Sequence, residues 1–222
     1  SSSHLQKKQK QTTRGSQRSK VKSSVKHAKI KSPQKTISRS IVLYGRGLHS
    51  GLKTGLILEP LPPDSGIHFG NLTNPETIPA DVTFVDNTNY STNLRYGSVS
   101  ARTIEHLMSA LSGLHIDNLN IYLDSSEVPI MDGSSKVFVD LIEKNGIKVQ
   151  NKKRKILKVK KEILVSSENS FVKLSPNNQF SIDFEIDFPS QLVSKQSCQL
   201  QLINGNYKTD IASARTFGFA KD

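Results

Sequence analysis

One stretch decides how this chain folds: Thr103-Ile104-Glu105-His106-Leu107-Met108-Ser109-Ala110-Leu111. Its apolar residues recur at i, i+3, i+4, i+7 and i+10, which predicts a helix with one apolar stripe: Ile104, Leu107, Met108, Leu111 and Leu114. At about 100° per residue, His106 lies nearly opposite that stripe and Glu105 on its flank. The residues around them are small: Ser109, Ser112 and Gly113. We therefore expect a substrate or a second layer of protein to approach this face. The plain alternative is a capped surface helix with an incidental Glu-His pair.

The excess positive charge of the chain is confined to its first residues. The 222 residues carry a net charge of +12, and residues 1–40 hold twelve of the 31 Lys and Arg residues and no acid. The remaining 19 basic residues face 19 acidic ones. We interpret residues 1–35 as a disordered basic extension, because they cannot bury enough apolar surface to offset the entropy of ordering. Three other roles stay open for it: organelle targeting, nucleic-acid binding, and contact with an anionic membrane surface.

Cysteine content and hydropathy exclude several classes of protein. Cys198 is the only cysteine, so a disulfide framework or a multi-cysteine zinc site within one chain is excluded, which fits a reducing compartment. No apolar run approaches the ~18 residues of a membrane span. The chain begins with Ser1 and stops after Asp222, and we expect both ends to be cut from a longer protein.

Strand and helix patterns alternate in a way that predicts an α+β fold. Short apolar strands are expected at Ile41–Leu43 and Leu56–Leu58, on either side of a glycine-rich turn. A third strand is expected within 118–124, where Leu119, Ile121 and Leu123 share one face. The helix at about 103–114 should stop at Gly113. A second helix should be capped by Ser134 or Ser135 and end at Gly146.

We divide the globular part into a first α+β domain, 36–150, and the beginning of a second, 151–222. In the second, Ile156–Val165 reads as a basic strand and Phe180–Phe188 as an alternating one. The acids of the latter share one face: Asp183, Glu185 and Asp187. We expect this face to be solvated and to pair with the basic strand rather than to hold a metal.

The Glu-His pair at the helix start suits metal-assisted hydrolysis. A neutral histidine binds Zn²⁺ through a ring nitrogen, and a neighbouring carboxylate can take a proton from an attacking water. Catalytic zinc needs about three protein ligands. The other histidines form no second spaced ligand pair, so spacing alone does not define a zinc site: His4, His27, His49, His68 and His115.

Five motifs occur together in register: Gly45-Arg46-Gly47-Leu48-His49-Ser50-Gly51, Thr103-Ile104-Glu105-His106-Leu107, Ile116-Asp117-Asn118, Glu127-Val128-Pro129-Ile130-Met131-Asp132-Gly133-Ser134 and Ala214-Arg215-Thr216-Phe217-Gly218-Phe219. In order and spacing the chain resembles the UDP-3-O-acyl-N-acetylglucosamine deacetylase family over about residues 36–222. The resemblance implies a cytoplasmic, monomeric zinc amidase of lipid A biosynthesis. It would hydrolyse the acetamide of a UDP-3-O-(3-hydroxyacyl)-N-acetylglucosamine substrate. It also implies two α+β domains of similar topology, each a two-layer sheet and helix unit, packed as a sandwich.

The resemblance also assigns roles to five residues. Glu105 would be the general base and His106 a zinc ligand. Thr216 would hydrogen-bond the developing oxyanion. Phe217 would contact the substrate, and His49 would lie beside it in the active site.

The match departs from the family after the last motif. About a third of the family's length is missing, including a His-x-x-x-Asp pair that completes the zinc site and a late histidine acting as general acid. Asn87 also replaces the Asp usual before Thr88. We therefore expect a complete first domain, a truncated second domain and weak zinc binding. The alternative function is a non-catalytic remnant that acts as a binding or scaffold protein. A nucleic-acid-binding module led by the extension is disfavoured, because the rest of the chain is neutral.

Overall fold

The central element of the fold is a five-stranded mixed sheet. A computed structural model describes residues 32–189, 193–203 and 205–216. The sheet order is β2 (Ile41–Arg46), β3 (Lys53–Pro60), β9 (Leu119–Leu123), β4 (Ile67–Asn71) and β5 (Asn74–Pro79). Neighbouring strands are antiparallel except β4 and β9, which run parallel. The three strands expected from the sequence are confirmed, and so is the α+β class.

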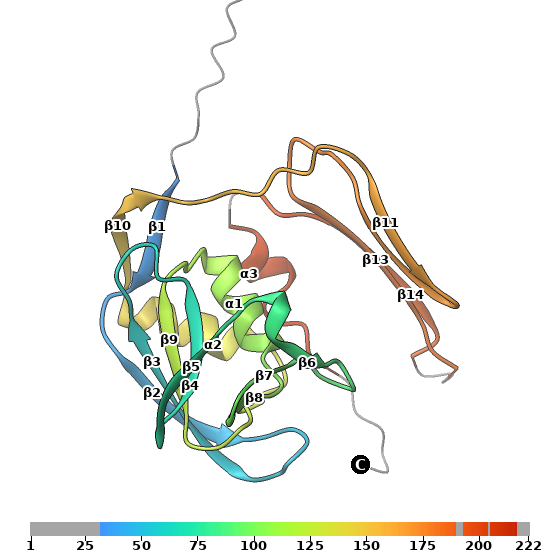
Figure 1. Cartoon of the computed structure of the whole chain (residues 1–222). Coiled ribbons are helices and arrows are strands. Elements are labelled where there is room, and N and C mark those ends of the chain that lie inside the picture. Colours follow the sequence, from blue (N-terminus) through green and yellow to red (C-terminus); the bar gives the residue numbers. More distant parts are fainter. Residues whose placement is uncertain (1–31, 190–192, 204, 217–222) are drawn as a thin grey trace, which may run out of the picture. The chain divides into compact units, whose positions relative to one another are not determined.

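Two helices pack beside each other against this sheet (Figure 1). They are α1 (Glu105–Leu114) and α2 (Lys136–Asn145), and both bury apolar side chains in the same core as the strands. Gly146 ends α2 with φ of 92°, as predicted. The predicted stop of α1 at Gly113 is wrong. The helix runs to Leu114, and His115 ends it in the left-handed conformation with φ of 59°.

The small-residue face of α1 is covered by a second layer of protein. Tyr207, at the start of the short helix α3 (Tyr207–Asp210), is buried on it, and its hydroxyl lies 2.7 Å from Ser109 Oγ. A Cβ atom on Gly113 would lie 2.2 Å from the Tyr207 ring. Ser109 and Gly113 are therefore explained by close packing of an aromatic ring, one of the two outcomes expected from the sequence, whereas Ser112 is exposed.

A smaller, three-stranded sheet directly precedes α1 in the sequence. It contains β6 (Val85–Asn87), β7 (Asn93–Tyr96) and β8 (Val99–Ala101), preceded by a single 3-10 turn, η1 (Val82–Phe84). Residues 67–101 thus consist of short strands, turns and one 3-10 turn.

One strand pair includes residues on both sides of each predicted boundary of the first domain. Strand β1 (Pro33–Ile37) pairs antiparallel with β10 (Ile147–Lys153), and Pro33 lies opposite Lys153. Residues 33–35 therefore belong to the fold and not to the extension, while the rest of the extension, 1–31, lies outside the described residues. The boundary placed after residue 150 falls inside β10.

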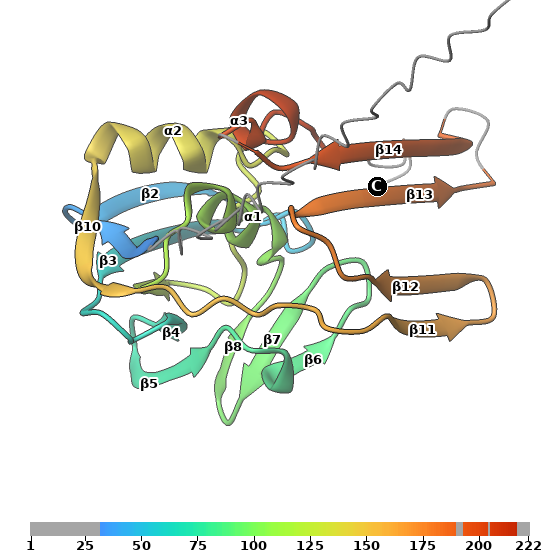
Figure 2. The same cartoon turned by 90° about the horizontal axis from the view of Figure 1, so that it is seen from above.

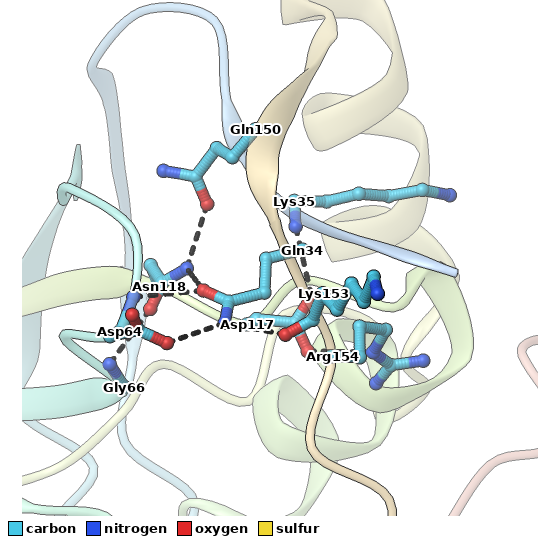
Figure 3. A network of polar contacts seen from close by, with 9 residues as sticks. All are labelled: Gln34, Lys35, Asp64, Gly66, Asp117, Asn118, Gln150, Lys153 and Arg154. Atoms are coloured by element: carbon cyan, nitrogen blue, oxygen red, sulfur yellow. Dashed lines mark hydrogen bonds and ion pairs between the residues drawn. The ribbon is translucent and has the colours of Figure 1, made fainter. Parts of the chain in front are cut away.

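Buried polar contacts fix this ladder to the rest of the fold (Figure 3). The amide of Gln34, which is only 4% exposed, donates to Asp64 Oδ1 at 2.7 Å and to the Lys153 carbonyl at 3.0 Å. It accepts from Asn118 Nδ2 at 2.9 Å. Asp117 accepts from the Lys35 N–H and from Arg154 Nε at 2.9 and 2.7 Å. The Ile116-Asp117-Asn118 motif is thus explained by a structural network.

The remaining strands form two separate hairpins. They pair β11 (Ile163–Ser167) with β12 (Ser170–Leu174) and β13 (Ser181–Asp187) with β14 (Lys195–Gln201) (Figure 2). The predicted strand at Ile156–Val165 begins only at Ile163, and its expected pairing with the acidic strand is wrong. The acidic face of β13 is solvated as expected, and Glu185 pairs with Lys195 of β14 at 3.0 Å. No helix in the described part of the chain combines the length and apolarity that crossing a membrane requires.

Candidate active site

The first turn of α1 presents Glu105 and His106, both half-buried. The preceding segment is held by the strand beside it: the Thr103 N–H donates to Asn93 Oδ1 at 3.3 Å and the Ile104 N–H to the Thr92 carbonyl at 3.3 Å. Glu105 Oε2 accepts from the Thr92 N–H at 3.1 Å. Within the described residues, Glu105 Oε1 makes no hydrogen bond. One oxygen of the carboxylate is therefore held while the other is available to a reacting water.

The glycine-rich turn joins β2 to β3 and carries His49. It is closed by a hydrogen bond from the Gly47 N–H to the Leu52 carbonyl, at 3.0 Å. The N–H groups of His49 and Ser50 donate to the two carboxylate oxygens of Glu127, each at 2.9 Å. This contact explains Gly47, because a Cβ atom there would lie 2.2 Å from Glu127 Oε2.

Glu127 is almost fully buried, with 1% of its surface exposed. Burial raises the pKa of a carboxyl group, but the hydrogen bonds donated by His49, Ser50 and Thr103 outweigh it and hold the Glu127 pKa below its ordinary value. The group is therefore an ionised carboxylate at neutral pH, and hydrogen-bond donors rather than a cation stabilise its charge.

The loop after Glu127 contacts two more of the predicted segments. The Thr216 N–H donates to the Gly133 carbonyl at 3.0 Å, and Arg215 lies 3.6 Å from Asp132 Oδ2. Farther along, Ser135 Oγ donates to the carbonyl of His106 at 2.8 Å. Ser135 occupies the predicted cap position of α2, but its side chain serves α1 instead.

The structure therefore connects four of the five predicted site residues through the single loop 125–135. This loop holds the turn of His49, the segment leading to Glu105, the carbonyl of His106 and the backbone of Thr216. Phe217 lies outside the described residues. Sequence reasoning placed Glu127 and Asp132 within a motif but gave them no role; the available signal was an acidic residue placed directly before the apolar run Val128–Ile130.

An open cavity of about 840 Å³ lies beside this loop. Its lining combines strand residues with loop residues: Tyr44, Arg46, Lys53, Ile130, Met131 and Asp132. Glu105 and His106 do not line this cavity. The cavity therefore adjoins the loop that positions the site.

Residues for a metal ion are incomplete in the described part of the chain. Residues 32–189, 193–203 and 205–216 contain no group of three or more His, Cys, Asp and Glu side chains placed to hold one. His106 offers one ring nitrogen, whereas a catalytic zinc site uses about three protein ligands. These residues do not by themselves fit a catalytic zinc ion.

Taken together, the α+β core carries a Glu-His pair at a helix start and, beside it, a glycine-rich turn anchored by a buried carboxylate. The model of the LpxC family, described as UDP-3-O-acyl N-acetylglycosamine deacetylase, matches residues 34–222. The chain belongs to this family.

Curated relatives carry the same description. The UDP-3-O-acyl-N-acetylglucosamine deacetylase of Nautilia profundicola is 42% identical over 189 residues, which cover 85% of this chain and 65% of that protein. The protein of the same description from Psychrobacter cryohalolentis is 40% identical over 193 residues, covering 85% and 60%. The chain thus spans somewhat less than two thirds of the length of these relatives.

Proposed function

We propose that this chain contributes to hydrolysis of the acetamide of UDP-3-O-(3-hydroxyacyl)-N-acetylglucosamine, which releases acetate and a free amine in lipid A biosynthesis. Family membership over residues 34–222 and the descriptions of the relatives support the substrate class. The observation that carries the chemistry is the Glu105 carboxylate, oriented by the Thr92 N–H directly beside His106.

Glu105 acts as the general base in this proposal. Its free oxygen takes a proton from water as the water oxygen bonds to the acetamide carbonyl carbon. The C–N bond then breaks, the proton held by Glu105 passes to the departing nitrogen, which leaves as the amine, and the acetic acid formed ionises to acetate. The Thr216 hydroxyl donates a hydrogen bond to the developing oxyanion, and His49 and Phe217 contact the substrate. A dependence on Zn²⁺, with His106 as one ligand, is part of the proposal and rests on the family resemblance.

Several expectations stay predictions. They are the monomeric state, the cytoplasmic location or organelle targeting through the basic extension, and the absence of specific nucleic-acid binding.

The test compares Glu105→Gln with the matched control Glu76→Gln, an exposed glutamate on β5. Acetate release and substrate affinity are measured separately. Glu105→Gln should lower kcat by about 10²–10⁴-fold with little change in affinity, because a general base acts in the transition state. The control should match the unsubstituted chain. A Glu105→Gln variant with near-normal kcat would contradict the proposal. Substrate binding by the unsubstituted chain without acetate release would favour the binding role instead.

A further inference from the structure

Glu127 is a buried carboxylate to which the proposed chemistry gives no task. It lies four residues after the end of β9 and is 1% exposed. Burying a charged group costs free energy unless it is fully hydrogen-bonded. Here both oxygens are engaged: Oε1 by the His49 N–H at 2.9 Å and by Thr103 Oγ1 at 3.0 Å, and Oε2 by the Ser50 N–H at 2.9 Å.

These donors come from two segments that are far apart in the sequence. One is the glycine-rich turn that carries His49. The other is the residue two positions before Glu105. Thr103 has φ of 56°, a left-handed conformation that is rare for a β-branched residue and persists only where its surroundings enforce it. The hydrogen bond to Glu127 and the bond from the Thr103 N–H to Asn93 supply that enforcement.

The contact is specific for a carboxylate. Every partner of the Glu127 carboxylate is a donor, and an ionised carboxylate only accepts. A glutamine in its place would turn an amide N–H₂ toward at least one of these donors. Hydrogen bonds to a charged group are roughly twice as strong as those between neutral groups. A change from Glu to Gln therefore disturbs the contact with almost no change in volume.

We propose that Glu127 is a positioning residue that fixes the turn of His49 against the Thr103–His106 segment and so sets the separation of His49 from Glu105. The effect of Glu127 on catalysis rests on the proposed function, whereas its effect on the position of the His49 turn does not.

The test uses the full 222-residue chain with Glu127→Gln and the matched control Asp124→Asn. Asp124 lies three residues earlier and also accepts from backbone and hydroxyl donors, the Gly55 N–H at 2.7 Å and Thr54 Oγ1 at 3.1 Å. It contacts no candidate site residue among those described. NMR spectra and amide hydrogen exchange are recorded well below the melting temperature.

Glu127→Gln should shift the His49 imidazole signals and raise the exchange rates of the His49 and Ser50 amides at least about tenfold, since their acceptor is weakened. Asp124→Asn should change the Thr54 and Gly55 signals and leave those of His49 and Ser50 in place. A Glu127→Gln protein that melts lower but keeps its His49 and Ser50 signals would show a merely structural role and overturn the proposal. Should Glu127→Gln fail to fold, Thr103→Val removes one donor without loss of volume and should shift the same His49 signals; unchanged signals there would also overturn it.

Kinetics provide the second readout. With UDP-3-O-(3-hydroxyacyl)-N-acetylglucosamine, Glu127→Gln should lower kcat about tenfold and leave KM within about twofold, because His49 and Glu105 lose their alignment and not their identity. Asp124→Asn should leave both constants unchanged. An unchanged kcat despite shifted His49 signals would overturn the positioning role. If the unsubstituted chain releases no acetate, the proposed function fails for this chain, while the NMR comparison still decides the geometric claim.

Discussion

Strands β9 and β13 have the same alternation of apolar and polar residues and very different burial. In β9, Leu119, Ile121 and Leu123 are fully buried. In β13, Phe184 is 58% exposed and its apolar neighbours are only half-buried. β9 pairs with two strands and β13 with one, but such pairing covers the edges of a strand and not its faces, so it does not explain the difference. Alternation therefore predicts a strand, whereas burial also needs a second layer on its apolar face, which α1 and α2 provide for β9.

The largest expected effect on stability should distinguish the core around β9 (the first region, 33–153) from the hairpins that include β13 (the second region, 163–201). Phe69→Ala removes a fully buried side chain from the core and should lower the free energy of unfolding by about 3–5 kcal/mol. Phe184→Ala should change it by less than about 0.5 kcal/mol, because the ring is largely solvated. Urea unfolding of both variants measures the difference. Equal losses would mean that the two regions are equally well packed.

A pair of deletions tests the corrected start of the first region. Removing residues 1–31 should leave the melting temperature unchanged, while removing 1–35 should lower it by at least about 5 °C. The longer deletion takes away Gln34 and its buried hydrogen bonds, at about 1 kcal/mol each. Differential scanning calorimetry distinguishes the two. A similar melt for both deletions would show that β1 contributes little to the fold.

Because Tyr207 of α3 packs on α1, the effect of Gly113→Ala on the free energy of unfolding should change sign when Tyr207 is removed. Gly113→Ala should lower the free energy of unfolding by about 1–3 kcal/mol, because the new methyl group overlaps the Tyr207 ring. With Tyr207→Ala present, the same substitution should stabilise by up to about 1 kcal/mol, since alanine favours a helix over glycine. Unfolding free energies of the four proteins form the cycle. Destabilisation in both backgrounds would contradict packing of Tyr207 on this face.

The smallest predicted effect is a dependence on pH. The pKa of Glu127 lies below the ordinary 4.5 of a glutamate, so the unfolded chain binds the proton more readily. Stability from this group is fully present above about pH 4.5 and is lost as pH falls through the lowered pKa. Melting temperatures from about pH 3 to 6 should therefore fall less steeply for Glu127→Gln than for the unsubstituted chain. Parallel curves would exclude Glu127 as a contributor to acid sensitivity.

Local pattern was sufficient for several elements of the first region. The strands around the glycine-rich turn, the alternating strand β9 and both long helices follow from periodicity and from capping residues such as Gly146. The start of β1 was missed because Pro33-Gln34-Lys35 looks like the polar extension. Its partner strand lies more than a hundred residues away, and local periodicity carries no information on that pairing.

Charge complementarity misled the prediction for the second region. The acids of β13 suggested pairing with the basic segment before it, but β13 pairs with β14, the next strand in the chain. Short connections favour sequential pairing, and exposed ion pairs contribute too little to override them. For the site, the motifs identified the segments that surround loop 125–135. They did not reveal that Glu127 links them, because that role depends on donors from two distant segments.

The ladder between β1 and β10 has a consequence for synthesis on the ribosome. Gln34 and the Lys153 carbonyl that accepts its hydrogen bond are separated by 119 positions. At about 5–20 residues added per second, β1 emerges roughly 6–24 s before its partner exists. During that interval the nascent chain can form the β2–β3 hairpin but cannot close the domain. Within the first region, β1 therefore has the longest interval between its own synthesis and that of its partner strand. During this interval its backbone is hydrogen-bonded to water.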